Sequence, residues 1–160
     1  LSVSYTETIP GRHFDEHGQH LAGAPSPQLP VIYPLVADED IIETLDLKIV
    51  EGVDFSGQDL KRPKAILNES AVRQLRLTRA LETKIDRGTM GSGEVDVIGI
   101  VKDFHFQSFY HRVEPLVIYS LDIANDPQHR ITYVLVKVNG ENIPATLKYM
   151  NDAWNRSAGN

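Results

Sequence analysis

The apolar pattern is strongest in residues 95–110. Residues 95–101 form a β-branched apolar run of strand length, and Phe104, Phe106 and Phe109 then alternate with polar residues. A run of this composition and length predicts a buried strand. We therefore expect a central strand that emerges into an aromatic-rich turn, with the rest of the chain built around it.

Several other segments have the pattern of strands. Residues 1–9 alternate as a half-buried strand does, with Val3, Tyr5 and Ile9 on one side and polar residues on the other. Residues 31–37 predict a second strand, in which Pro30 and Pro34 indicate an edge position or an interrupted ladder. Further short strands are expected over 65–67, 116–121 and 131–138, and the glycine-rich segment 87–93 should return the chain into the central strand as a hairpin.

Three segments predict helices. Asp38 is placed to cap a short helix over 38–46, and Asn68 to cap a second one that runs to about residue 77. A third helix is expected over 142–156, with one apolar stripe that should pack on the sheet: Ile143, Leu147, Met150 and Trp154. Strand–helix passages combined with hairpins predict a mixed α+β domain.

Composition narrows the class of protein. The chain has 160 residues, 41% of them hydrophobic, and no cysteine, which predicts one globular domain and excludes thiolate metal sites and redox motifs. No apolar run approaches the roughly 20 residues of a spanning helix. Because the sequence begins at Leu1 rather than Met, we expect it to be a piece of a longer protein.

The charge is unevenly distributed along the chain. Residues 1–60 carry eleven acidic and two basic side chains, whereas 61–90 carry eight basic and three acidic ones. The net charge is −6, which argues against nucleic acid as a partner. Arg73, Arg76 and Arg79 have helical spacing and are expected to form a solvated helix face.

Three groups of residues have the types that chemistry requires. Asp103, His105 and Ser108 supply the side chains of a hydrolase triad, but neighbours on an extended chain rarely converge, so we expect packing and not catalysis there. Three histidines have helical spacing and are a weak candidate for a metal site: His13, His17 and His20. The segment that contains them favours a solvated loop instead. The glycines of 88–93 lack the Gly-Lys-Ser/Thr of a phosphate loop and favour a hairpin.

A central signature and four further motifs, in order along the chain, resemble a known family. The segment 97–108, Val-Ile-Gly-Ile-Val-Lys-Asp-Phe-His-Phe-Gln-Ser, resembles the signature of the extracytoplasmic domain of MacB-like and FtsX-like ABC transporter permeases. Segment 40–56 is similar to the family's stretch ending in Gly-Arg-Asp-Phe, and 65–71 to its Asn-Glu helix start; Glu114-Pro115 and the strand 133–138 follow in the family's order. Val53 stands where that pattern has Arg, Thr83-Lys84 where it has Gly-Lys, and Leu75-Arg76 where it has Leu-Gly.

The resemblance implies a fold and a role. The fold would be α+β, with mixed sheets, helices packed on one face, and a porter-like lobe (about 1–58 with 115–160) that carries a smaller inserted lobe (about 59–114). The domain would lie outside the cytoplasmic (inner) membrane, between the first two transmembrane helices of a permease. It would be no enzyme and use no cofactor, and would couple ATP-driven movement of those helices to export or to activation of a partner.

The implied partners are the protein's own transmembrane helices, a cytoplasmic ATPase, a second permease copy and a periplasmic adaptor. The alternative is a free-standing exported ligand-binding module, indicated by the histidine-rich loop and the strand prolines. The residues that carry the resemblance are expected to be structural: Asn68, Glu69, Gly99, Lys102, Asp103, Phe104, His105, Phe106, Ser108 and Pro115.

Overall fold

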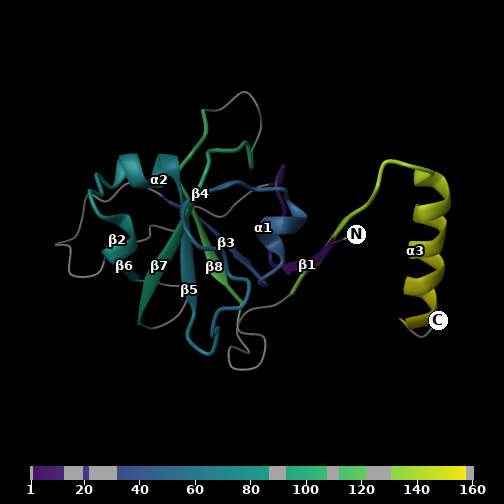
Figure 1. Cartoon of the computed structure of the whole chain (residues 1–160). Helices are drawn as coiled ribbons and strands as arrows, with labels where there is room; N and C mark the ends of the chain where they lie inside the picture. Colours follow the sequence, from purple (N-terminus) through teal and green to yellow (C-terminus); the bar gives the residue numbers. More distant parts are fainter. Residues whose placement is uncertain are drawn as a thin grey trace.

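The computed structural model describes residues 2–12, 20–21, 32–86, 93–107, 112–121 and 131–157. The helices are α1 (Ile41–Thr44), α2 (Glu69–Gln74), the 3-10 turn Ala80–Glu82 and α3 (Ile143–Ser157) (Figure 1). The strands are β1 (Ser2–Thr6), β2 (His20–Leu21), β3 (Tyr33–Ala37), β4 (Ile49–Gly52), β5 (Lys64–Asn68), β6 (Lys84–Asp86), β7 (Glu94–Val101), β8 (Leu116–Ser120) and β9 (Tyr133–Lys137).

One mixed sheet organises the described residues. Its nine strands have the order β2-β6-β7-β5-β8-β3-β1-β9, and β4 pairs with β7 beside this path. β7 is parallel to β5 and antiparallel to β6 and β4, which confirms a strand at 95–101 inside the sheet. The antiparallel pairing of β6 with β7 agrees with the predicted hairpin. Parallel and antiparallel pairs in one sheet, with few helices, confirm the α+β class.

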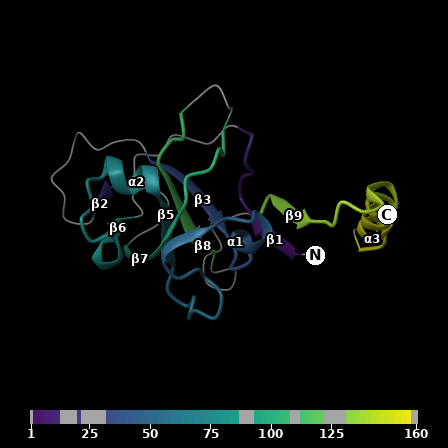
Figure 2. The ribbon, with the colours of Figure 1, turned by 45° about the horizontal axis from the view of Figure 1, so that its top comes forward.

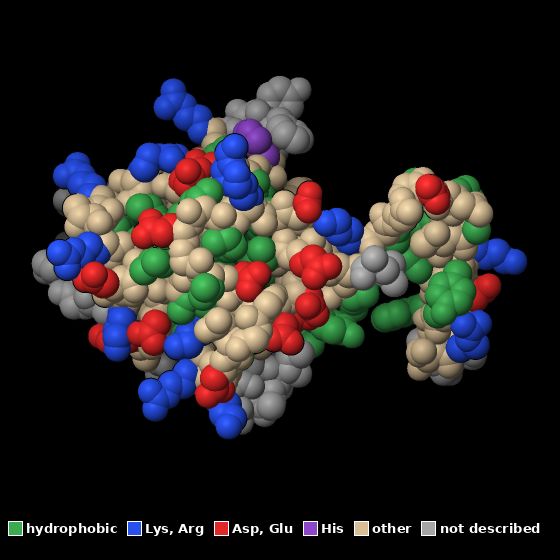
Figure 3. Space-filling model, viewed as in Figure 1, with side chains coloured by type: hydrophobic (Ala, Val, Ile, Leu, Met, Phe, Trp, Pro, Cys, Tyr) green, Lys and Arg blue, Asp and Glu red, His purple; other side chains and the backbone are tan. Residues whose placement is uncertain are grey.

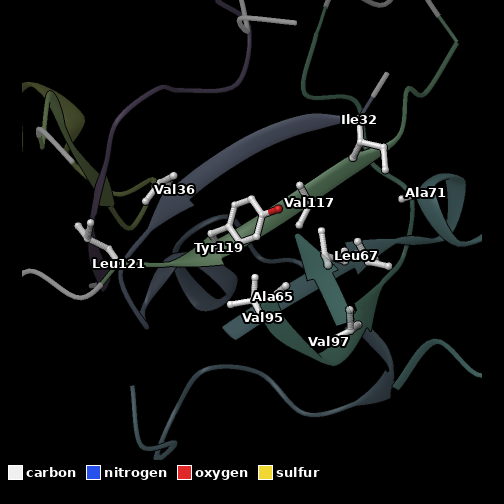
Figure 4. Packing of buried hydrophobic residues seen from close by; sticks show 11 residues of the cluster. Ile32, Val36, Ala65, Leu67, Ala71, Val95, Val97, Val117, Tyr119 and Leu121 are labelled. Atoms are coloured by element: carbon white, nitrogen blue, oxygen red, sulfur yellow. The ribbon is translucent and has the colours of Figure 1, made fainter. Parts of the chain in front are cut away.

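Buried side chains form a cluster on each face of the sheet. The first cluster includes Leu35, Ile66 and Ile118 and also contains Phe55 and Phe106. The second includes Val36, Leu67 and Tyr119, together with Ala71 of α2 (Figure 4). Residues adjacent along a strand point to opposite faces, so β3, β5 and β8 supply both clusters and are buried on both sides.

The second strand of the sequence lies inside the sheet. β3 pairs with β8 along its whole length, whereas its other side meets β1 only at the pair Thr6–Ala37. Pro34 therefore lies where a ladder is interrupted, which is one of the two arrangements that the sequence indicates, and the edge position is excluded.

β1 is half-buried as expected, but its polar side is the buried one. Ser4 and Thr6 are fully buried, while Tyr5 is 41% exposed. The buried hydroxyls have partners: Ser2 Oγ lies 2.7 Å from Thr44 Oγ1, Ser4 Oγ donates to Asp38 Oδ1 (2.7 Å), and Thr6 Oγ1 donates to the Val36 carbonyl (2.8 Å). Because hydrogen-bonded hydroxyls can be buried at little cost, the polar side of this strand faces the interior.

Asp38 does less at the first helix than the sequence predicts. The residue before α1 is Asp40, whose side chain makes no capping bond. Asp38 accepts a hydrogen bond from the Asp40 amide (3.3 Å) and others from Ser4 and from the Tyr5 amide (3.0 Å). Its carboxylate therefore mainly fastens β1 to the segment after β3.

The last helix forms over the predicted residues but does not pack on the sheet. None of its side chains is buried, and Figure 2 shows it standing apart from the body beyond β9. The expectation that its stripe packs on the sheet, and with it the packing of helices on one face, is wrong for α3. No helix within the described residues has the length and apolar character needed to cross a membrane.

Candidate functional site: the junction of α2 with residues 102–107

Asn68 joins three segments at the end of β5. Its side chain is fully buried. The Oδ1 atom accepts hydrogen bonds from the Ala71 amide (2.8 Å) and the Leu116 amide (2.9 Å), and Nδ2 donates to the Glu114 carbonyl (2.8 Å). Asn68 therefore caps α2, as predicted, and in addition ties that cap to the start of β8.

Asp103 fastens the segment after β7 to the same end of α2. Its Oδ1 accepts from the Ser70 amide (2.8 Å), and its Oδ2 accepts from Ser70 Oγ (2.9 Å) and from an Arg73 guanidinium nitrogen (2.6 Å). In return, the Asp103 amide donates to Glu69 Oε2 (3.0 Å). A carboxylate is favourable here because the amides of the first helical turn are free to donate.

The Arg73 side chain responds to this contact. The hydrogen bond with Asp103, supported by the charges of Asp103 and Glu69 and opposed by desolvation, raises the pKa of Arg73 above its ordinary value. Because this pKa is higher in the folded state, the pair contributes its full stabilisation at lower pH. That contribution is lost only as the pH rises through the raised pKa. The Arg73 guanidinium therefore keeps its charge in the neutral range.

The aromatic residues of the signature anchor the same segment to the core. Phe106 is 1% exposed and meets Tyr33 edge-on, with ring centroids 5.8 Å apart. The Phe104 ring lies 6.0 Å from that of Phe106, and the Phe106 carbonyl accepts from the Gly11 amide (2.8 Å). Pro115 is buried beside them, and its carbonyl accepts from the Tyr33 amide (2.9 Å).

Two glycines allow a close approach where β4 ends beside β7. Gly52 pairs with Gly99. A Cβ on Gly52 would collide with the Ile98 carbonyl oxygen, and one on Gly99 with the Val53 carbonyl oxygen. Gly52 also has φ +77°, a conformation that favours glycine. Gly99 is thus required by this backbone contact. The chain that follows β4 is held by Phe55, which is fully buried.

Arg76, which stands where the family pattern has Gly, lies at the C-terminal end of α2. The Leu77 amide donates to the Val72 carbonyl (3.1 Å) and the Arg76 amide to the Arg73 carbonyl (3.1 Å), which is the Schellman pattern of a helix end. This pattern places the residue after the C-cap in the left-handed region, and Arg76 has φ +53°. The helix therefore ends as a Leu-Gly sequence would end it, with an arginine in a strained position.

The two triad residues that the structure describes, Asp103 and His105, do not form a catalytic arrangement. Both oxygens of Asp103 accept hydrogen bonds from α2, His105 is exposed, and Ser108 lies outside the described residues. Lys102 is also exposed, and its amide donates to the Lys48 carbonyl (2.8 Å). The carboxylate that would orient a catalytic histidine is thus committed to the helix.

The proposed metal ligands are largely outside the described part of the chain. His13 and His17 lie outside it, and His20 is placed only by its backbone in β2. Among the described residues, no group of three or more His, Cys, Asp or Glu side chains is positioned to hold a metal ion. Metal binding by this loop therefore stays a prediction, as does the hairpin loop at 88–92.

Sequence reasoning missed the roles of Ser70 and Arg73. Arg73 has the spacing of a solvated helix face, and its side chain is 64% exposed, but its guanidinium pairs with Asp103. Ser70 lies inside the Asn-Glu motif without an evident purpose. One signal in the sequence could have indicated this contact, namely Asp103 shortly after a buried strand. A carboxylate in that place can reach the free amides at the start of a neighbouring helix.

The hydrogen bonds of this junction join structural elements to one another. Its polar atoms are paired with one another, and buried networks of this kind hold their elements in one arrangement. It connects α2, the end of β7 and the start of β8, which are far apart in sequence.

Comparison with known proteins gives matches among solved structures. No protein-family model matches the chain, and no significant match is found among curated proteins. The periplasmic region of MacB from Actinobacillus actinomycetemcomitans is similar over 99% of this chain and 68% of its own, with a TM-score of 0.70 and 14% identity. The extracellular domain of the noncanonic ABC-type transporter YknZ from Gram-positive bacteria is similar over 99% and 76%, with a TM-score of 0.62 and 14% identity.

A domain of a protein described as a permease, from Porphyromonas gingivalis, is also similar. It matches 97% of this chain and 68% of its own, with a TM-score of 0.60 and 10% identity. Two of these three structures are named as parts of a permease or of an ABC-type transporter, and none of the three is named as an enzyme. The chain therefore has the same fold as the periplasmic region of MacB and the extracellular domain of YknZ.

Proposed function

We propose that this chain is a non-catalytic extracytoplasmic domain of an ABC transporter permease subunit. The observation that carries the proposal is the match of nearly the whole chain, 97–99% of it, to three domains of transporter proteins. The paired junction around Asn68 and Asp103 supports it, because the signature residues there bind structural elements to one another.

The role we propose is mechanical. ATP hydrolysis by a cytoplasmic ATPase moves the transmembrane helices of the permease, and this domain carries the movement to cargo or to a partner outside the inner membrane. A second permease copy and a periplasmic adaptor are the further partners. Packed sheets and satisfied polar networks suit this task because they move as rigid bodies.

The proposal includes the two-lobe organisation. One half of the sheet, β8-β3-β1-β9, comes from residues near both ends of the chain, and the other half is built mainly from residues 64–101. This distribution supports a lobe made from both ends with a second lobe inserted in the middle.

The alternative of a free-standing ligand-binding module has lost part of its support. It depended on an edge strand with prolines, and β3 lies inside the sheet. It also predicts a parent protein with a secretion signal and no membrane span. The transporter proposal predicts hydrophobic spans of about 20 residues in the parent protein, one before this segment and three after it.

The side of the membrane on which this domain lies is tested by cysteine labelling. Val50 is 45% exposed and the chain has no cysteine, so Val50→Cys in a parent protein without other reactive thiols gives one accessible probe. A membrane-impermeant maleimide should label it in intact spheroplasts. Labelling only after lysis would refute the extracytoplasmic position.

Movement is tested with the same position in the reconstituted transporter. A spin label at Val50→Cys in both copies should report different inter-copy distances without nucleotide and in the ATP-trapped state. Identical distance distributions in the two states would contradict the mechanical role while leaving the membrane location intact.

A further inference from the structure

The side of the sheet that carries the first cluster continues along β7 beyond that cluster. Val95 and Val97 belong to the second cluster, so Asp96 between them points to the opposite side. Ile98 packs against the first cluster and therefore lies on the same side as Asp96. This part of the sheet is thus charged at Asp96 and apolar at Ile98.

A groove lies over this part of the sheet. It has a volume of about 430 Å³ and is open to solvent. Two aliphatic side chains line it, Val53 after β4 and Leu81 on the 3-10 turn, which are 48% and 37% exposed. In the region of β6 and β7, Figure 3 shows hydrophobic side chains among Lys, Arg, Asp and Glu side chains. We call the surface formed by six residues the β7 groove: Val53, Lys64, Leu81, Lys84, Asp96 and Ile98.

Both apolar walls of the β7 groove are fixed by backbone contacts. The Val53 amide donates to the Ile98 carbonyl (3.0 Å), and the 3-10 turn ends at Thr83, whose carbonyl accepts from the backbone of β7 (3.1 Å). A Cβ on Gly52 would lie 3.0 Å from Leu81 Cδ2, so Leu81 lies over the space that this glycine leaves open. The groove is therefore preformed, which lowers the cost of binding.

Two lysines at the charged end of the groove have hydrogen-bond donors to spare. Lys64 on β5 and Lys84 on β6 both lie opposite Asp96. Lys64 Nζ donates to Asp96 (3.2 Å), whereas Lys84 Nζ is 3.8 Å from Asp96 and 3.8 Å from Glu94, beyond hydrogen-bond distance. Because an ammonium carries three donor hydrogens, the two lysines together can hold one more carboxylate.

The spacing of the two ends defines the shape of the occupant. Asp96 and Ile98 are two residues apart on β7, about 6–7 Å at roughly 3.3 Å per residue. In an extended segment, side chains two positions apart point to the same side with the same separation. The remaining acid of the groove lining, Glu82, is paired with Arg79 (3.2 Å), so it does not reverse the preference for an anion. An aliphatic residue and an acidic residue two positions apart therefore match both ends.

We propose that the β7 groove docks an extended segment of a partner protein, in which an aliphatic residue and an Asp or Glu are two positions apart. The aliphatic side chain lies between Val53 and Leu81, and the carboxylate accepts hydrogen bonds from Lys64 and Lys84. A protein segment fits better than a small molecule, because the groove is open and small-ligand sites enclose most of the ligand's surface. The proposal deepens the proposed function by naming a surface for a partner outside the membrane, and rests on it for its biological setting only.

Val53 makes the apolar end of the groove particular to this sequence. The family pattern that 40–56 resembles has Arg at this place. An arginine there would replace an apolar wall with a third cation in the groove. The aliphatic part of the occupant is therefore the part that depends on Val53.

Titration with short peptides, followed by NMR of the isotope-labelled chain, tests the proposal. The acetylated and amidated peptide Ser-Leu-Ser-Glu-Ser should shift the amide signals of 52–53, 81–84 and 96–98, with a dissociation constant in the millimolar range. The peptide Ser-Leu-Glu-Ser-Ser, whose Leu and Glu point to opposite sides when extended, should bind about threefold more weakly or worse. Equal affinity for the two peptides, equal affinity for hexanoate, or no shift at these amides would overturn the proposal.

Matched variants separate the groove from its surroundings. Val53→Ser should weaken binding of the first peptide about threefold or more, whereas Val50→Ser, at a valine of similar exposure (45%) outside the groove, should leave it unchanged. Lys84→Glu should also weaken binding about threefold or more, whereas Lys148→Glu on α3 makes the same change in net charge and should have no effect.

Equal effects within either pair of variants would overturn the proposal. The amide spectrum of each variant shows in the same experiment that the chain is folded. These measurements do not depend on membrane location, so the docking proposal and the proposed function can fail separately.

Discussion

Replacement of Asn68 by alanine is the sharpest test of the junction. The substitution removes the cap of α2, for which about 1 kcal/mol is typical. It also leaves the Leu116 amide and the Glu114 carbonyl without their partner, and each unsatisfied buried group costs about 1–3 kcal/mol. Since water can enter the space left by the side chain, we expect a total loss of about 3–4 kcal/mol.

The two parts of that loss can be separated. Asn68→Ser retains an oxygen that can cap the helix but is too short to bridge to β8, so it should recover about 1 kcal/mol relative to Asn68→Ala. Asp40 provides the matched control, because it precedes α1 without a side-chain capping bond. Asp40→Ala should change stability by less than about 0.5 kcal/mol.

Urea unfolding followed by circular dichroism measures these differences, with the slope m checked for constancy. In a domain of this length, 3–4 kcal/mol corresponds to a Tm lower by about 10 °C. The reasoning is refuted if Asn68→Ala costs less than about 1 kcal/mol, or if Asn68→Ser is as stable as the unsubstituted chain, because the bridge to β8 would then contribute nothing.

Two backbone positions give further predictions. Arg76→Gly should stabilise the domain by about 0.5–1 kcal/mol, because relief of the left-handed conformation exceeds the added entropy of the unfolded chain; a lower urea midpoint would contradict the role assigned to its φ of +53°. Gly99→Ala should destabilise it by about 2–3 kcal/mol through collision with the Val53 carbonyl. Gly140→Ala, where an added Cβ meets nothing within 4 Å, is the control and should be close to neutral. Equal effects of the two glycine substitutions would argue against the close contact between Gly99 and the Val53 carbonyl.

The sequence determined most of the elements because their signals are local. The β-branched run before Lys102 predicts the central strand, and Asn68 before an amphipathic segment predicts the cap of α2. Each of these depends on residues within one or two turns of chain, so no knowledge of distant segments is needed.

Contacts between distant segments were decided by the tertiary structure. Asp103 and Ser70 are 33 residues apart, and no periodicity reports that an acid after one strand will bond the start of a helix after another. An aspartate at position 103 fits both a hydrolase triad and a structural junction. Only the position of α2, whose residues Asp103 binds, distinguishes the two interpretations.

Which side of a periodic element is covered was also a tertiary decision. Alternation in β1 establishes that its two sides differ, but Ser4 and Thr6 face the interior because Asp38 and the Val36 carbonyl are there to accept their hydrogen bonds. The stripe of α3 likewise establishes an apolar surface without naming its partner. Local pattern fixes the shape and polarity of each element, whereas the partner of each surface depends on what the rest of the molecule brings within reach.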